Sequence, residues 1–230
     1  MIFKDKFACK DIRVISPNIG EGTFSHVSLC KVVRRGVPSR ELYAVKTFFW
    51  SDLKRAECPV YRKRGRVKVH SGAFQLRREL RILRCLSGQS DHVLQLDYAK
   101  QTPDSVLVFT KFAGCPIMHF SDMWYTACVL GDTCRSPDMD TNYLNTLTFE
   151  DAEICLAQLS AALAHVHKAG VVHKDVKPDN VLIRVPFTRW VRRSVSDLSA
   201  SSLVEEVHMD PPHLTLCDFN LSERVDDGRI

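Results

Sequence analysis

The chain has 230 residues, of which 45% are hydrophobic and 26% are charged. This composition excludes a largely disordered chain and is sufficient for one large domain or two small lobes with apolar cores. No apolar run approaches the roughly 18 residues that a membrane span needs, and residues 1–13 alternate charged and hydrophobic residues instead of forming a signal-peptide core. We therefore expect a cytoplasmic or nuclear protein that does not bind a membrane.

The formal net charge of +5 is concentrated in one segment, since residues 51–70 hold seven Lys or Arg residues against two acidic ones. Such a run is typical of a solvated loop, and the alternative is a docking arm for an acidic partner or a nucleic acid. Nucleic acid is the weaker alternative, because Tyr61 is the one aromatic residue there and single strands bind by stacking on aromatic side chains.

The nine cysteines are an odd number, are scattered along the chain and include no C-x-x-C pair. This pattern indicates neither a disulfide framework nor a zinc site. We expect most of the cysteines to be small core residues.

Five strands and one helix are predicted in the first half of the chain. Residues 12–33 favour two strands around a glycine turn, and residues 41–50 favour a third. A helix is expected from about 74 to 86, followed by two further strands over 93–96 and 106–109.

In the second half, the polar and irregular residues 120–147 are typical of a loop or insertion. Thr148 and Asp151 then form a capping box for a helix that ends at Gly170. The apolar stripe of this helix is expected to comprise Leu156, Leu159, Leu163 and Val166. The serine-rich residues 184–213 indicate a second insertion, between strands over 181–183 and 214–217.

A glycine turn in "IGEGTFSHV" is the first chemical motif. Gly20 and Gly22 leave no Cβ between the backbone amides and a phosphate group. The signal is weak alone, because many hairpins carry two glycines and because Ser25 stands where G-x-G-x-x-G has its third glycine.

Two charged residues lie on apolar faces. The period of two along the strand "ELYAVKTFF" places Lys46 on one face with Leu42, Ala44 and Phe48. The helical period places Glu79 within the arc of Leu76, Leu80, Leu83 and Leu86. An unpaired buried carboxylate costs several kcal/mol, so we predict that Lys46 pairs with Glu79. The alternatives are an edge-strand lysine and a glutamate at the rim of the stripe, each reaching water.

The segment "HKDVKPDN" crowds ionisable groups between apolar runs. Asp175 can accept a hydroxyl proton, and Lys177 adds a cation two residues later. Asn180, together with Asp218 in "LCDFN", offers the hard oxygen ligands that Mg²⁺ takes alongside water and phosphates.

Together these five features resemble, in order and over nearly the whole chain, the eukaryotic protein kinases, whose signature set is a glycine loop, a strand lysine, a helix glutamate, H-R-D-x-x-x-x-N and D-F-G. The resemblance implies an α+β bilobal fold. Residues 9–109 would form a five-stranded antiparallel sheet with one key helix and a basic insert at 51–72. Residues 110–230 would form a partial, mainly helical lobe with inserts at 120–147 and 184–213. Because the sequence stops soon after D-F-N, we expect a fragment of a longer kinase, with the helix after Thr148 partly exposed on its apolar face.

The resemblance also implies a role for each matching residue. Lys46 would hold the ATP phosphates, Glu79 would orient Lys46, Asp175 would be the catalytic aspartate and Lys177 would neutralise the transferred group. Asn180 and Asp218 would bind Mg²⁺. The glycine loop over the phosphates would comprise Ile19, Gly20, Glu21, Gly22, Thr23, Phe24 and Ser25. The adenine site would comprise Val27 and Ala44 above the base, Phe109 behind it, and a hinge from Thr110 to Phe112.

Four positions depart from the family pattern or call for comment. Ser25 is tolerable in the loop if its φ is negative. Lys174 replaces the arginine of H-R-D and lacks its two-pronged fork, which weakens the case for control through a phosphorylated activation loop. Asn220 replaces the glycine of D-F-G and suits a left-handed backbone better than most residues. Cys217 would lie at the pocket floor, either as a reactive thiol or as an inert buried one.

The implied activity is transfer of the γ-phosphoryl group of ATP, with Mg²⁺, to serine or threonine hydroxyls of protein substrates. The alternative is a catalytically impaired, nucleotide-binding pseudokinase or scaffold. The "GEGTFS" and "SGQSDHV" stretches and the long inserts also resemble the replication-initiation kinases of the cell-division-cycle seven type. That narrower resemblance implies a cell-cycle role and an activating regulatory subunit.

Overall fold

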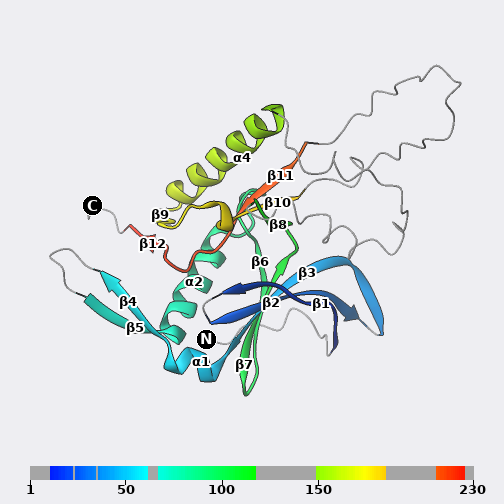
Figure 1. Ribbon diagram of the computed structural model, residues 1–230, viewed down its shortest axis with the longest axis vertical. Helices are drawn as coiled ribbons and strands as arrows, with labels where there is room; N and C mark the ends of the chain where they lie inside the picture. Colours follow the sequence, from blue (N-terminus) through cyan, green and yellow to red (C-terminus); the bar gives the residue numbers. More distant parts are fainter. Residues whose placement is uncertain are drawn as a thin grey trace, which may run out of the picture.

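The computed structural model describes residues 11–22, 24–34, 36–61, 67–117, 149–184 and 211–225. The predicted insertion over 120–147 lies outside the described residues, as does most of the one over 184–213. The described chain forms a twisted sheet with one long helix against it, joined to a second part built around another long helix (Figure 1).

The predicted five-stranded antiparallel sheet is confirmed, in the order β1-β2-β3-β7-β6. Its strands are β1 (Asp11–Gly22), β2 (Ser25–Arg34), β3 (Val37–Phe49), β6 (Leu96–Gln101) and β7 (Ser105–Lys111). The strand expected over 93–96 is wrong, because β6 begins only at Leu96. Val93 is instead fully buried and forms an isolated bridge to Leu216, so its hydrophobicity serves a contact outside this sheet.

Helix α2 (Gly72–Leu86) packs against the sheet. Ser71 caps its start, with the Ser71 Oγ accepting a hydrogen bond from the Phe74 N–H at 3.3 Å. The helix ends before Gly88, whose φ of +82° suits the left-handed turn there. All four leucines of the predicted stripe are buried, and Leu76 and Leu80 pack against Phe48, Ala99, Val106 and Val108 of the sheet.

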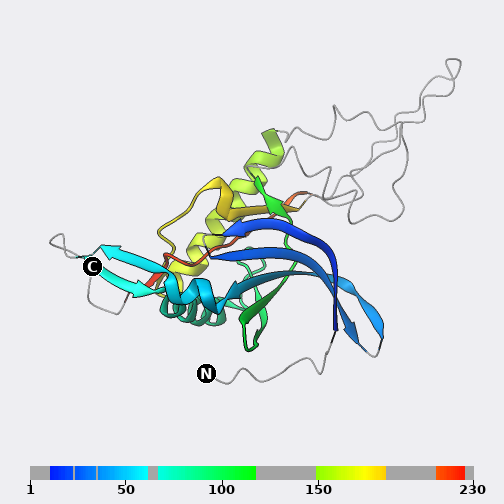
Figure 2. The same cartoon turned by 60° about the horizontal axis from the view of Figure 1, so that its bottom comes forward.

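The basic segment over 51–70 contains regular structure and is not one solvated loop. It includes helix α1 (Trp50–Arg55) and a hairpin of β4 (Glu57–Tyr61) and β5 (Val67–Ser71). Helix α1 has Asp52 in its first turn and Lys54 and Arg55 in its last turn, which complements the helix dipole. The hairpin projects from the molecule beside α2, as Figures 1 and 2 agree.

The second part is organised by helix α4 (Phe149–Lys168) and three small strand groups. Strand β10 lies between β11 and β8, β12 pairs with β9, and the 3-10 helix η3 leads into β10. Their bounds are β8 (Cys115–Pro116), β9 (Val171–Val172), η3 (Pro178–Asn180), β10 (Val181–Arg184), β11 (His213–Leu216) and β12 (Glu223–Arg224). Among the described helices, none combines the length and apolar character needed to cross a membrane.

The buried side of α4 differs from the predicted stripe by one position. Val166 is buried as expected and Leu159 and Leu163 are partly buried, but Leu156 is 66% exposed because Cys155 takes its place. Thr148 of the predicted capping box lies outside the described residues, and Asp151 is buried. The core around α4 also includes Ile82, Leu83 and Leu86, so α2 packs against both parts of the molecule.

Gly114, which leads from the sheet into β8, provides a test of how the two parts are joined. Its φ is +115°, and a Cβ there would clash with the backbone carbonyl of Ile183 in β10. Gly88 also has a positive φ, but a Cβ there would meet open space. We expect Gly114→Ala to lower the free energy of unfolding by about 3 kcal/mol and Gly88→Ala by about 1 kcal/mol, as measured by urea denaturation. Equal losses would contradict the close approach at Gly114.

Candidate functional site

The predicted contact between Lys46 and Glu79 is present. Strand β3 presents Lys46 toward α2, and the Lys46 Nζ lies 3.4 Å from the Glu79 Oε1. Glu79 is 6% exposed, so it does not bend to water at the rim of the helix stripe. Lys46 lies on a strand with a hydrogen-bonded neighbour on each side, which excludes the edge-strand alternative.

A second carboxylate, that of Asp218, faces the same ammonium group. The Lys46 Nζ lies 3.8 Å from the Asp218 Oδ1. Burial opposes the charge of Lys46, but the two carboxylates outweigh it and raise the pKa of the lysine, so it remains an ammonium group. Burial raises the pKa of Glu79, and the nearby ammonium group offsets part of that rise.

Asp218 sits in a strained backbone position with an unsatisfied oxygen. Its φ is +61°, a region that costs a non-glycine residue roughly 1–2 kcal/mol. Its Oδ1 is buried without a hydrogen-bond donor, while its Oδ2 is 3.5 Å from the Asn220 Nδ2. A buried carboxylate oxygen with no donor is poised for a cation.

The segment from His173 to Asn180 is held together by its own side chains. The Asp175 Oδ2 accepts a hydrogen bond from the Asn180 Nδ2 at 2.9 Å and lies 3.1 Å from the Lys177 Nζ. The Asn180 Nδ2 also donates to the Asp175 carbonyl at 2.8 Å. The hydrogen bond to Asp175 raises the pKa of Lys177. Because both bonds use the amide nitrogen of Asn180, its amide oxygen is the end that could bind a cation.

A backbone hydrogen bond connects this segment to the one that carries Asp218. The Cys217 N–H donates to the Asn180 carbonyl at 2.9 Å, so the two candidate metal ligands are fixed relative to each other. Within the described ranges, no group of three or more His, Cys, Asp or Glu residues forms a metal cluster. A pair of protein oxygens fits Mg²⁺, which keeps most of its ligands from water and phosphates.

His173 is a residue whose structural role the sequence reasoning missed. It is 1% exposed, its Nε2 lies 2.9 Å from the Cys217 carbonyl, and its Nδ1 accepts from the Asp175 N–H at 3.3 Å. These two bonds define a neutral ring with its proton on Nε2, and burial lowers its pKa. The signal was available, because this histidine directly precedes Lys174 and Asp175 in the motif.

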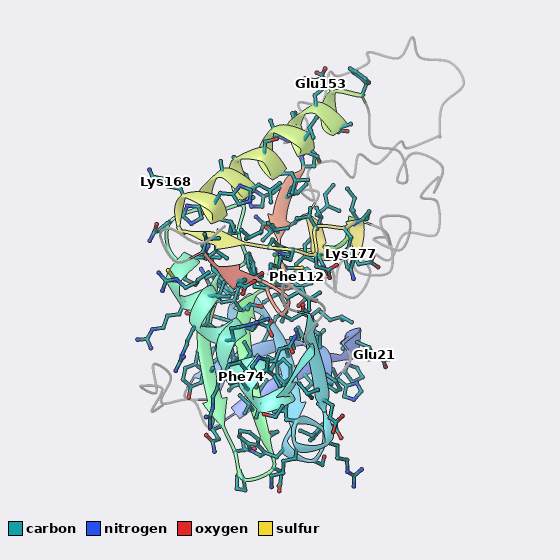
Figure 3. All side chains as sticks on the ribbon, turned by 90° about the vertical axis from the view of Figure 1, so that its left-hand side faces the viewer. Glu21, Phe74, Phe112, Glu153, Lys168 and Lys177 are labelled. Carbon is teal, nitrogen blue, oxygen red and sulfur yellow. The ribbon has the colours of Figure 1, made fainter. Side chains whose placement is uncertain are left out.

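The glycine hairpin lies close to Lys46. Gly22 pairs with Ser25 across the β1–β2 turn, and a Cβ on Gly22 would lie 2.6 Å from the Ser25 Oγ and 3.9 Å from the Lys46 Cε. Val27 is paired with Lys46 on β3. Thr23 lies outside the described residues. Figure 3 shows Glu21 in the sheet region and Phe112 and Lys177 near the junction with the part that contains α4.

The other predicted loop residues, Ile19, Gly20 and Phe24, belong to or adjoin the same hairpin. Gly20 pairs with Val27, and Ile19 and Phe24 are partly exposed. The two strands of the hairpin are therefore paired as predicted on both sides of Thr23. Contact of the hairpin with a nucleotide stays a prediction.

The prediction that Phe109 lies behind a bound base is wrong. Phe109 pairs with Val45 and packs with Tyr43 and Tyr98 on the face of the sheet opposite Lys46. Thr110 pairs with Ala44, so these two side chains share the face of Lys46.

The predicted hinge also differs in one hydrogen bond. The Phe112 N–H donates to the Leu42 carbonyl at 3.0 Å and is therefore unavailable to a base.

The departures from the family pattern have different outcomes. Ser25 has no positive φ, so its loop position is tolerated as expected. Asn220 has no positive φ either, and the left-handed residue is Asp218 instead. Lys174 has a φ of +69° and forms an ion pair with Glu223. Burial raises the pKa of Cys217 to about 12, which favours the inert thiol.

Comparison with known proteins places this geometry in context. The protein kinase domain family matches residues 14–229. The chain is 28% identical over 167 residues to ribosomal protein S6 kinase alpha-3 of Mus musculus, covering 72% of the chain and 17% of that protein. It is 26% identical to the serine/threonine-protein kinase ppk18 of Schizosaccharomyces pombe, covering 76% of the chain and 10% of that protein.

A third relative, the serine/threonine-protein kinase MRCK gamma of Mus musculus, is 29% identical over 72% of the chain and 8% of its own length. The chain thus spans less than a fifth of each of these relatives. They give no support to the narrower resemblance to replication-initiation kinases.

The buried, neutral His173 predicts a pH dependence of stability. Its folded pKa is lower than the value of about 6.5 expected in the unfolded chain, so the unfolded state binds more protons. The stabilisation from the neutral ring is therefore complete at a pH above about 6.5. As the pH drops through that value, the free energy of unfolding falls by at most about 1.4 kcal/mol per pH unit. We expect urea denaturation between pH 7.5 and 5 to show this slope, and His173→Asn to reduce it. An unchanged slope in the variant would contradict the assignment.

Proposed function

The chain belongs to the protein kinase family, and from that premise we propose that it transfers the γ-phosphoryl group of Mg²⁺-bound ATP to serine or threonine hydroxyls of protein substrates. The proposal rests chiefly on one arrangement. The Lys46 ammonium group lies between the Glu79 carboxylate and the Asp218 Oδ1, which has no donor of its own. A cation beside a carboxylate oxygen that has no hydrogen-bond donor suits a ligand that brings both negative phosphates and a divalent metal.

The phosphate end of the nucleotide would be bound by groups from three elements. Lys46 would contact phosphate oxygens while Glu79 keeps its side chain extended from β3. Gly22 would allow the backbone of the β1–β2 turn to approach the same phosphates, because it has no Cβ. Asp218 and Asn180 would hold Mg²⁺, which supplies charge neutralisation on the phosphates when it is bound.

Asp175 would accept the proton of the substrate hydroxyl. Its side chain is 24% exposed, and the two donors on its Oδ2 leave the Oδ1 as the acceptor for an incoming hydroxyl. Lys177 would stay charged beside it, because the ion pair raises its pKa, and would balance negative charge on the group in transfer.

The base would bind between Ala44 and Val27 on one side and the chain that follows β7. Thr110, on the face of Lys46, takes the place that sequence reasoning gave to Phe109. Since the Phe112 N–H is already bonded to Leu42, the backbone groups of Lys111 and Ala113 are the candidates for hydrogen bonds to adenine. A serine or threonine acceptor fits the serine/threonine-protein kinases among the relatives and the lysine two residues after Asp175.

The test compares two substitutions in the same loop, made in the natural full-length protein. We expect Asp175→Asn to lower transfer of radiolabelled phosphate to a serine-containing substrate peptide by 10²–10⁴-fold, because the hydroxyl proton loses its acceptor. Asp179→Asn, which makes the same change at an exposed neighbouring residue, is expected to retain activity within about threefold.

Binding of a fluorescent ATP analogue, measured in parallel, is expected to persist in both variants. Equal activity of Asp175→Asn and the unsubstituted protein would refute the role of Asp175. Nucleotide binding without phosphate transfer in the unsubstituted protein would instead support the pseudokinase alternative.

A further inference from the structure

The outer side of α2 presents a line of arginines. Arg77, Arg81 and Arg84 are all exposed, and their spacing of four and three residues places them on one stripe of the helix. From Arg77 to Arg84 the helix axis rises by about 10 Å. Phe74, one turn earlier on the same stripe, is 48% exposed and is labelled on α2 in Figure 3. We call these four residues the arginine stripe.

Among the described residues, no carboxylate balances the charges of the arginine stripe. No ion pair joins its arginines to any carboxylate in the part of the chain that the structure describes. The one carboxylate of α2, Glu79, is buried on the other side against Lys46. Like charges spaced by four residues destabilise a helix by a few tenths of a kcal/mol, and solvated helix faces ordinarily mix both signs. The unrelieved repulsion favours an external anion.

An apolar spot adjoins the N-terminal end of the stripe. Phe74 is 48% exposed, and its ring stacks on the His70 ring with centroids 4.3 Å apart. The surface therefore combines an apolar spot with three guanidinium groups in line. A protein segment with acidic residues and one apolar anchor complements both features.

We propose that the arginine stripe is a docking site for an acidic segment of a protein partner. Its carboxylates would pair with Arg77, Arg81 and Arg84, whose planar guanidinium groups bind carboxylates through two hydrogen bonds each. Its apolar side chain would pack on Phe74. A nucleic acid fits less well, because the one aromatic ring of the stripe already stacks on His70 and does not offer that face to a base.

The experiment measures docking without nucleotide, so that it succeeds or fails independently of phosphoryl transfer. The probe is a fluorescein-labelled, 14-residue helical peptide with glutamates at three positions spaced by four and three residues and a leucine one turn away. Its binding to the natural full-length protein is followed by fluorescence anisotropy. We expect Arg77→Glu/Arg81→Glu to weaken binding at least tenfold. The matched control, Arg13→Glu/Arg40→Glu, makes the same change of net charge at exposed positions on β1 and β3 and is expected to weaken binding less than twofold.

Arg77→Gln/Arg81→Gln adds no new charge to the helix and is expected to weaken binding of the same peptide at least fivefold. This variant guards against a folding defect in the charge-reversed variant. A peptide with glutamine in place of glutamate is expected not to bind. Equal weakening by the stripe and control variants, or no binding of the acidic peptide, would overturn the proposal. Tighter binding of a single-stranded oligonucleotide through the same arginines would overturn the assignment to a protein partner.

Discussion

The buried carboxylate of Glu79 is the constraint on which the described structure depends. Helix α2 carries it on the face that packs against the sheet, and an uncompensated charge there would cost about 3 kcal/mol or more. Lys46 compensates it from β3 at 3.4 Å. The helix and the sheet are therefore held in one relative position by an electrostatic requirement as well as by the leucines around it. The same ammonium group then faces Asp218 from the second part of the molecule, so one cation relates three distant segments of the chain.

The second part presents Asp218 at that cation and ties Asn180 to the neighbouring residue Cys217. Asn180 is fixed through its nitrogen at Asp175 and through its carbonyl at Cys217, the residue before Asp218. Lys174 and Asp218 both adopt left-handed backbone conformations. Such strain is found where the surrounding structure over-determines a functional geometry. Here it accompanies the ion pair of Lys174 with Glu223 and the unsatisfied oxygen of Asp218.

The sequence predicts the parts of this arrangement that follow from periodicity. A charge inside an apolar stripe indicates a buried partner, and Lys46 and Glu79 were recognisable in this way. The face of Phe109 was not recognisable, because a shift of one residue in strand register moves every side chain to the opposite face. Thr110, not Phe109, shares the face of Lys46.

The sequence also did not predict which residue has a left-handed backbone conformation. In "CDFN", Asp218 and not Asn220 adopts the left-handed backbone conformation. Tertiary contacts, and not the intrinsic preference of each residue, decide which of the two does so. The hairpin of β4 and β5 within the basic segment was missed for a similar reason. Its charged composition is equally typical of a solvated loop, and pairing between its strands leaves little trace in composition.

The measurement that tests the account most directly is a double-mutant cycle on the free energy of unfolding, with Lys46→Met, Glu79→Gln and the two combined. Lys46→Met leaves a buried carboxylate without its cation and is expected to cost about 3 kcal/mol, whereas the combined variant leaves no uncompensated charge at Glu79. The account therefore predicts that the combined loss is smaller than the sum of the single losses by at least about 1.5 kcal/mol. Additive losses would mean that Lys46 does not compensate Glu79, and would contradict the account.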